Sequence, residues 1–245
     1  MRQFVRFVSK PPTRFLTRSL TRPLARSLAR RLLPLVAVAV AACATTPPPP
    51  PPPPPAPPSS GQTGAVLMDW RGVITGADRD RYQRRQAAWD LALQQARRQK
   101  GSGDLDGLGD LIAPDAARPG VTPPVGNYRC RTVKLGSQGG EDGLGYVVYG
   151  WFACRIEQTP GGLKFTKLTG SQRPSGLLFP ENDRHMLLLG SLALAQEPAA
   201  NSYGRNPERD MVAVLERIGE ARWRLVAPWP QNESNLDLIE LVPAN

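Results

Sequence analysis

A run of prolines separates the first part of this chain from a longer second part. Residues 47–55 are all proline, and Ala56, Pro57 and Pro58 extend the run. Proline fixes φ and has no N–H to donate, so neither a helix interior nor a central strand passes through such a tract. We expect a polyproline II rod of roughly 37 Å over residues 47–58. We interpret the rod as a spacer, and we expect the folded domain to begin near Ala65.

Residues 1–42 have the composition of an export signal. Their apolar run, residues 32–42, is far shorter than the ~20 residues of a membrane-spanning helix, and it fits the apolar segment of a signal peptide. Nine basic residues and no acidic residue precede this run. An Arg-rich organelle transit peptide is the alternative, because it shares this charge pattern. It does not explain why small residues and a cysteine end the apolar run, so we favour the export signal.

The tetrapeptide Val40-Ala41-Ala42-Cys43 resembles the lipobox of bacterial lipoproteins. The resemblance implies that residues 1–42 are removed and that Cys43 is lipidated, which makes the membrane a partner of the chain. Ala44 rather than aspartate follows the cysteine, and this resembles an outer-membrane sorting signal. We therefore expect a lipid-anchored protein of the cell envelope, at the outer membrane and facing the periplasm, with residues 43–64 as its tether.

The excess of basic residues belongs to the leader. The whole chain has 31 Lys and Arg against 21 Asp and Glu, and its sequence pI is about 10.1. Nine of the 31 lie before Cys43, which leaves 22 against 21 in the mature chain. A strongly basic domain would indicate a nucleic-acid partner. Because the mature chain is nearly neutral, we expect no nucleic-acid binding.

We place a single globular domain at residues 65–245, helical over 69–115 and β-rich over 126–243. A chain of this length is sufficient for one domain with one core. Thr75 has the position of an N-cap, and apolar residues at helical spacing after it predict a helix over 76–99.

From residue 126 onward, short apolar runs separated by Pro, Gly and Asn predict strands. Residues 186–195 are apolar on both faces, so their strand should be central or enclosed. We predict a mainly β (α+β) fold, in which an N-terminal helix precedes an antiparallel meander of about eight strands. The meander should close into a barrel, and a two-sheet sandwich is the alternative. The expected strands are 128–135, 145–158, 163–169, 175–180, 185–196, 210–218, 222–228 and 236–242.

The first two strands predict a hairpin with a disulfide. A turn about Asp142 sets Cys130 directly across from Cys154, with Gly143 in the left-handed position of a three-residue turn. With Cys43 lipidated, these two cysteines are the ones that remain, and an exported domain folds in an oxidising compartment. We therefore predict a Cys130–Cys154 disulfide.

The same register makes two further predictions. It sets Arg129 opposite Arg155, an unfavourable pair of like charges. It also buries the disulfide against Tyr128 and the apolar face of the second strand. The residues expected on that face are Tyr146, Val148, Gly150, Phe152, Cys154 and Ile156.

Several motifs of the mature chain are specific enough for comparison. They are Asp69-Trp70, Ile74-Thr75, Asp78, Trp89, Tyr128-Arg129-Cys130-Arg131, Cys154, Leu168-Thr169-Gly170-Ser171-Gln172-Arg173, Tyr203-Gly204-Arg205-Asn206-Pro207-Glu208-Arg209, Arg222-Trp223-Arg224-Leu225 and Pro228-Trp229-Pro230. Together they resemble an uncharacterised family of proteobacterial envelope lipoproteins that carries only a domain-of-unknown-function label. The resemblance covers residues 67–243 and implies an envelope location and the extent of the domain, without a known activity.

The start of the β-rich region has a second resemblance. Gly126-Asn127-Tyr128 is similar to the Gly-x-Trp start of lipocalin- and avidin-like barrels, with tyrosine in place of tryptophan. In those barrels an arginine near the last strand packs on the aromatic ring. The resemblance implies that Arg222 or Arg224 packs on Tyr128.

The sequence predicts no catalytic, cofactor-binding or metal-binding residue. The single histidine, His185, opens the most apolar strand without a nucleophile pattern beside it, and one histidine with paired cysteines cannot form a typical zinc site. Arg173, Arg205 and Arg209 lie in predicted loops and are candidates for binding an anion.

Two classes of function remain open. The first is a non-enzymatic envelope lipoprotein whose β-rich domain, held off the membrane by the tether, binds a partner protein, a cell-wall component or a small ligand. The second is a periplasmic hydrolase that uses carboxylate or arginine chemistry, which leaves no fixed spacing in a sequence.

The lipid anchor gives the first testable prediction. Changing Cys43 to Ser should leave an unprocessed precursor and abolish labelling by a radioactive or clickable fatty acid, because the thiol that carries the lipid is gone. Cys130→Ser provides the control and should be processed and labelled normally. Normal processing of the Cys43→Ser protein would show that the anchor is assigned wrongly.

Overall fold

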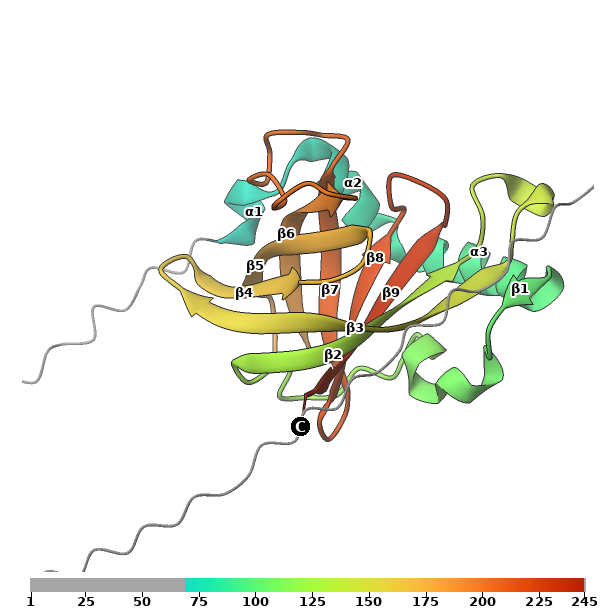
Figure 1. The fold of residues 1–245 in the computed structure, drawn as a ribbon, viewed down its shortest axis with the longest axis horizontal. Coiled ribbons are helices and arrows are strands. Elements are labelled where there is room, and N and C mark those ends of the chain that lie inside the picture. The colour runs from blue at the N-terminus through green and yellow to red at the C-terminus, as the bar shows by residue number, and fades with distance from the viewer. Residues whose placement is uncertain (1–68, 245) are drawn as a thin grey trace, which may run out of the picture. The chain divides into compact units, whose positions relative to one another are not determined.

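The computed structural model describes residues 69–244, in which helices precede an antiparallel β-barrel (Figure 1). The export signal, the lipidated Cys43 and the tether lie outside the described residues. Between residues 69 and 244, no helix combines the length and the apolar character needed to cross a membrane. The helical elements are α1 (Trp70–Val73), α2 (Gly76–Gln83), α3 (Arg85–Arg98), η1 (Asp106–Ile112) and η2 (Gly140–Asp142).

The helix predicted over 76–99 is divided into α2 and α3. Thr75 is its N-cap, and the Thr75 hydroxyl accepts a hydrogen bond from the backbone N–H of Asp78 at 3.3 Å. Helical geometry is interrupted at Arg84. There the indole of Trp229 donates to the Arg84 carbonyl at 3.1 Å, and the Arg84 guanidinium lies over the Trp229 ring. The break thus coincides with a contact to the barrel, which helical periodicity does not encode.

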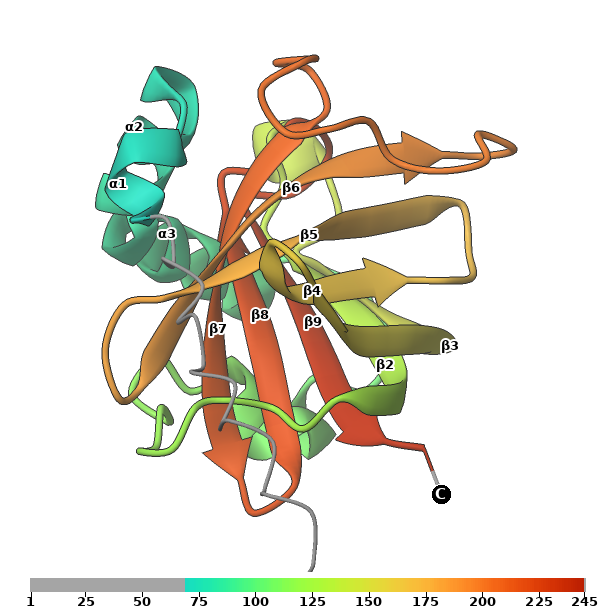
Figure 2. The same ribbon diagram turned by 90° about the vertical axis from the view of Figure 1, so that its left-hand side faces the viewer.

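Eight antiparallel strands close into a barrel. Each strand pairs with the next along the chain, β9 pairs back with β2, and β3 pairs with β4 (Figure 2). The predicted meander and barrel are confirmed, and the sandwich is excluded. The two-residue strand β1 (Gly101–Ser102) adds a parallel bridge to the start of β3. The barrel strands are β2 (Gly126–Leu135), β3 (Tyr146–Thr159), β4 (Gly162–Lys167), β5 (Gln172–Pro180), β6 (His185–Leu194), β7 (Asp210–Gly219), β8 (Arg222–Pro228) and β9 (Leu236–Pro243).

The strands bury apolar side chains on both faces of the sheet. One cluster takes alternate residues from all eight strands and fills the inside of the barrel, with Phe165 and Leu225 fully buried in it. The other cluster covers the outer face, where Trp70, Trp89 and Leu108 come from the helical segment. This explains why β6 is apolar on both faces, as predicted for an enclosed strand. Both clusters are formed by residues 69–244, so this segment carries the core.

One end of the barrel is plugged. The segment that leads into β2 places Val121 in the inner cluster, and the Val121 carbonyl accepts a hydrogen bond from the indole of Trp223 at 2.8 Å. The Tyr128 ring packs edge-on against the Trp223 ring, with 6.2 Å between centroids. The arginine that the lipocalin resemblance placed on Tyr128 is therefore absent from this contact: Arg222 pairs with Glu240, and Arg224 lies over Trp89.

A β-bulge divides β3 into two halves. Val148 pairs with Val133, but Trp151 pairs with Arg131, so β3 has one more residue than β2 in this stretch, at Tyr149 and Gly150. Because one extra residue exchanges the two faces of a strand, the single apolar face predicted for β3 is wrong. Tyr146 and Val148 pack on the outer cluster, whereas Phe152, Cys154 and Ile156 pack on the inner one.

The Cys130–Cys154 disulfide is present, with 5.9 Å between the two Cα atoms. The register predicted for it is wrong by two residues, since Cys154 lies opposite Tyr128 and the bridge runs diagonally between the strands. The observed register removes the predicted clash of like charges. Arg155 lies opposite Asn127, and its guanidinium donates to the Asn127 side chain at 3.2 Å.

The turn between β2 and β3 also differs from the prediction. Gly143 has an extended backbone, with φ of −91°, and left-handed φ angles occur instead at Gly136 and Gly140. The connection contains η2, so it is longer than a three-residue turn. At Gly136 a side chain would meet the Cα of Ala92 at 3.0 Å. The turn is therefore set by packing against α3, which the local turn pattern does not show.

A fully buried arginine joins the helical segment to the barrel. Arg224 of β8 lies opposite Glu216 of β7, and Arg224 Nε donates to Glu216 Oε2 at 2.7 Å. The remaining guanidinium donors bind backbone carbonyls of residues 110–114, at the end of η1, and the guanidinium lies 4.9 Å from the centroid of the Trp89 ring. Helix ends leave carbonyls without intrahelical partners, and Arg224 satisfies this set.

Removing the Arg224 guanidinium should therefore destabilise the whole domain. We expect Arg224→Met to lower the free energy of unfolding by about 3–5 kcal/mol, because it leaves Glu216 and several carbonyls buried without their donor. Lys164→Met is the matched control. In the parent protein, Lys164 Nζ lies 3.8 Å from Glu157 Oε1 in an exposed ion pair. Its loss should lower the free energy of unfolding by under ~1 kcal/mol. Urea unfolding of residues 44–245 measures both, and equal losses would contradict the central role of Arg224.

Candidate functional site

The end of the barrel opposite Val121 holds a cavity of about 500 Å³. This volume is in the range of small-molecule sites, and the mouth of a β-barrel is a common place for one. The strands supply a wall that is mainly apolar over β5, β6 and β7 and carries polar groups on β2 and β9. The main apolar lining residues are Pro174, Leu192, Leu194, Met211, Trp229 and Ile239.

Two loops with unusual backbone geometry border this cavity. Between residues 69 and 244, positive φ angles at residues other than glycine occur at Ala195, Trp229 and Glu233. Ala195 directly follows β6, and the other two belong to the β8–β9 loop and line the cavity. Left-handed backbone at such residues costs free energy and persists only where its surroundings impose it. The rim of the cavity therefore has a strained backbone conformation that the surrounding structure imposes.

Tertiary hydrogen bonds hold the β8–β9 loop in place. The Asn235 side chain donates to the Gln95 side chain of α3 at 2.7 Å and to the carbonyl of Ser137 at 3.2 Å. The Gln138 side chain donates to the carbonyls of Pro230 and Ser234. These contacts fix the loop to α3 and to the β2–β3 connection.

The β6–β7 loop is tied to α2. The Tyr203 hydroxyl donates to the buried carboxylate of Asp78 at 2.8 Å. Burial and the neighbouring carboxylate raise the pKa of Tyr203, so the phenol keeps its proton. The Asp210 carboxylate accepts hydrogen bonds from the backbone of Gly204, and Arg81 donates to the carbonyl of Asp210. This network fixes the backbone next to Arg209.

Inside the mouth, Lys134 of β2 is neutralised by two carboxylates. Its side chain is only 8% exposed, and Lys134 Nζ lies 3.1 Å from both Glu233 Oε2 and Asp237 Oδ2. Burial disfavours the ammonium, but the two carboxylates outweigh it and raise the pKa of Lys134. Burial also raises the pKa of Asp237, against the effect of Lys134. The three groups form a compact neutralising cluster on one side of the cavity.

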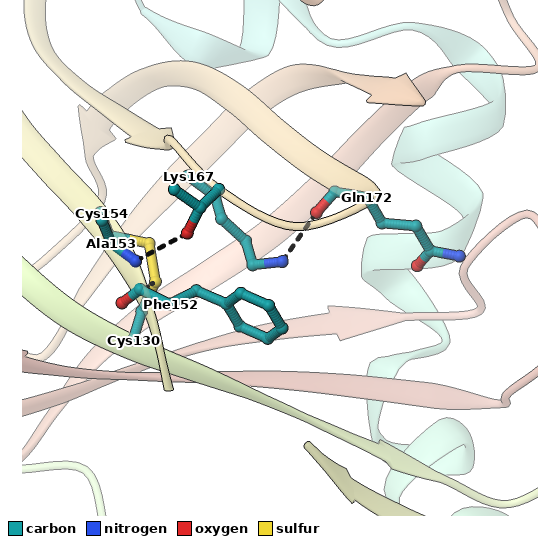
Figure 3. The surroundings of a disulfide bond; sticks show 7 residues. Cys130, Phe152, Ala153, Cys154, Lys167 and Gln172 are labelled. Carbon is teal, nitrogen blue, oxygen red and sulfur yellow. Dashed lines mark hydrogen bonds between the residues drawn. A yellow bond between two sulfur atoms is a disulfide. The ribbon is translucent and has the colours of Figure 1, made fainter. Parts of the chain in front are cut away.

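Lys167, the last residue of β4, is in a different position. It is 4% exposed, its ammonium donates to the Gln172 carbonyl at 2.8 Å, and Nζ lies 3.9 Å from the centroid of the Phe152 ring (Figure 3). The charged neighbours that act on it are Arg173 and Lys134, both cations. Burial, Arg173 and Lys134 lower the pKa of Lys167 to about 8.

The three arginines proposed for anion binding do not converge. Arg173 donates to the carbonyls of Gly170 and Ala195, so it joins the β4–β5 turn to the start of the β6–β7 loop. Arg205 is exposed. Arg209 alone of the three lines the cavity. Arg209 Nη2 lies 3.3 Å from Glu197 Oε1, and Arg209 Nη1 is buried without a hydrogen-bond partner among the described residues.

His185 belongs to the plugged end, where its Nε2 lies 3.4 Å from Glu216 Oε1. It is far along β6 from the cavity-lining Leu192 and Leu194. Among residues 69–244, no group of three or more His, Cys, Asp or Glu side chains is arranged to hold a metal ion. The charged residues that line the cavity are Arg81, Lys134, Arg209, Asp210, Glu233 and Asp237.

Sequence reasoning missed Lys134, Lys167 and Asp237. Each ends or interrupts an inward-facing row that is otherwise apolar, such as Leu163, Phe165 and Lys167 in β4. A charged residue at the end of such a row would have marked the open mouth of a barrel. Strand alternation in the sequence contains this information. It can be used only when the face of each strand that points into the barrel is known.

Comparison with known proteins gives one family. The family described as Domain of unknown function (DUF4893) matches residues 70–241. No curated protein matches the chain. No solved structure matches it either.

The position of Lys167 predicts how stability depends on pH. Its folded pKa of about 8 lies below the ordinary value of 10.5, so the unfolded chain binds more protons between these values. The free energy of unfolding should therefore rise with pH in this window, by up to about 1.4 kcal/mol per unit. Urea unfolding between pH 7.5 and 10 measures this rise.

Variants isolate the contribution of Lys167 from that of the tyrosines, which also titrate at high pH. Lys167→Met should abolish the rise relative to the parent protein, whereas the exposed control Lys164→Met should retain it. If the parent and Lys167→Met have parallel pH profiles, Lys167 is not the lysine with the lowered pKa.

Proposed function

The chain belongs to the DUF4893 family, a domain of unknown function, and from the geometry of its barrel we propose that it is a binding protein of the bacterial cell envelope. In this proposal Cys43 carries the lipid anchor at the outer membrane, and residues 43–64 hold the domain away from the membrane on the periplasmic side. The barrel binds a small, largely apolar molecule in its mouth. The family description states no function, so ligand binding is proposed from the structure of the barrel. The lipid anchor is proposed from the sequence, because Cys43 lies outside the described residues.

The cavity is the observation that carries the proposal. Interiors of folded proteins are close-packed, and the plugged end of this barrel follows that rule. A space of about 500 Å³ at the other end, with apolar walls and a rim fixed by hydrogen bonds to α2 and α3, departs from it. Half-buried Leu192 and Leu194 face this space. A ligand that covers them would gain hydrophobic stabilisation without a large rearrangement of the protein.

The geometry favours binding over hydrolysis. Glu233 and Asp237 line the cavity, as a carboxylate-based hydrolase would require. Both, however, are in contact with the Lys134 ammonium, and Asp237 also accepts a hydrogen bond from the Ser234 hydroxyl. Their role here is to balance the charge of a buried lysine. We therefore prefer the binding protein to the hydrolase alternative.

Binding of a neutral apolar probe tests this proposal. N-phenyl-1-naphthylamine should bind residues 44–245 saturably, with a rise in its fluorescence. Leu192→Trp fills the cavity and should weaken this binding by about tenfold or more, because the indole occupies the ligand's space. Leu144→Trp is the matched control, since Leu144 is 50% exposed and outside the cavity; it should leave the affinity unchanged.

Circular dichroism and thermal unfolding establish that both variants are folded. Native mass spectrometry of protein purified from the periplasm should in addition detect a bound small molecule that Leu192→Trp loses. A folded parent protein without saturable probe binding would contradict the proposal. So would a Leu192→Trp protein that binds as tightly as the parent.

A further inference from the structure

The cavity wall contains a guanidinium nitrogen whose partner is missing. Arg209 Nη1 is buried and has no hydrogen-bond partner within residues 69–244, while Nη2 of the same side chain contacts Glu197 at 3.3 Å. Buried polar groups are hydrogen-bonded in the great majority of cases, and an exception needs an explanation. Arg209 lines the cavity, so a ligand bound there lies beside the guanidinium. Nη1 itself has almost no accessible surface, so a small rotation of the side chain must bring it to the acceptor.

Lys167, at the end of β4, also lacks hydrogen-bond acceptors. An ammonium has three N–H donors, and the structure gives Lys167 the Gln172 carbonyl as acceptor and the Phe152 ring as a second contact. The charged groups acting on it are cations. Lys134, by comparison, has two carboxylates within 3.1 Å. Of these two buried lysines, Lys167 is therefore the one whose charge is not compensated by the protein around it.

Strand pairing brings Arg209 and Lys167 to the same side of the cavity. The acceptor of Lys167 is the carbonyl of Gln172, and Gln172 of β5 pairs with Leu194 of β6. The backbone N–H of Leu192 donates to the carbonyl of Arg209 at 2.9 Å. Gln172, Leu192, Leu194 and Arg209 all line the cavity. Arg209 is thus part of the wall, and Lys167 adjoins the wall through Gln172 without lining the cavity itself.

We propose that this section of the wall is an anion-binding site, and that the ligand is an amphipathic molecule whose carboxylate or phosphate bonds to Arg209 and lies next to the charge of Lys167. Its apolar part lies against Leu192 and Leu194. The anion completes the hydrogen bonds of Arg209 and compensates the charge of Lys167. Arg173, held by backbone carbonyls, is a positioning residue that fixes the turn next to Lys167. This inference rests on the proposed binding function and adds the chemical class of the ligand.

A series of ligands with one alkyl chain and different head groups tests the inference. Decanoate, decyl phosphate, decan-1-ol and decylammonium are each titrated into residues 44–245 at pH 7, by displacement of N-phenyl-1-naphthylamine and by calorimetry. Decanoate or decyl phosphate should bind about tenfold or more tightly than decan-1-ol, because hydrogen bonds to a charged group are the strong ones. Decylammonium should bind more weakly than the alcohol. The tighter of the two anions identifies the head group.

Variants locate the site. Lys167→Met and Arg209→Met should each reduce the preference for the anion over the alcohol by about fivefold or more. Lys167→Arg and Arg209→Lys keep the charge and should retain most of the preference. The matched controls Lys164→Met and Arg205→Met remove exposed cations near the same strands and loop, and they should have no effect.

The outcomes separate this inference from the function on which it rests. If N-phenyl-1-naphthylamine binds but the parent protein does not prefer an anion over decan-1-ol, the anion site is wrong and the proposed binding function stands. If the preference exists but survives in both methionine variants, Arg209 and Lys167 are wrongly assigned. The comparison of head groups on the parent protein needs no variant, so it remains decisive even if a variant does not fold.

Discussion

The interaction on which the architecture depends is the buried contact of Arg224 with Glu216 and with the carbonyls at the end of η1. Arg224 is completely buried, and it bonds at once to the neighbouring strand β7 and to residues 110–114, beneath the ring of Trp89. A charge in such a place is tolerable only when its donors are satisfied. The contact therefore fixes where the helical segment lies on the barrel, and α2 and α3 in turn hold the two loops at the cavity rim.

The two ends of the barrel differ for a physical reason. At one end, Trp223, Tyr128 and Val121 fill the space between the strands, and the disulfide ties β2 to β3 nearby. On the N-terminal side of the bulge at Tyr149 and Gly150, the apolar side chains of β3 point outward and pack on the outer cluster. The inward positions at the mouth are then occupied by groups such as Lys134 and Asp237, which hold each other by charge and do not close-pack. The result is an open, partly polar mouth above a buried apolar core.

The mouth combines features that a purely structural core would not retain. Backbone strain at Trp229 and Glu233 is held by tertiary hydrogen bonds, one lysine is fully compensated, and a second lysine and an arginine are not. Natural proteins depart from consistent packing and pairing mainly at functional sites. This concentration of departures in one place connects the fold to the proposed binding of an amphipathic anion.

The sequence by itself determined the eight strands, the N-cap at Thr75 and the identity of the disulfide partners. These follow from local patterns: apolar alternation, turn residues, a capping residue and the count of cysteines. The strand register, the break at Arg84, the turn at Gly136 and the position of Arg209 in the cavity wall were decided by the tertiary structure. One inserted residue at Gly150 exchanges the faces of β3, and a contact from Trp229 accompanies the break in a regular helix. Such effects arise between segments far apart in the chain, and the cavity exists only where their inward faces meet.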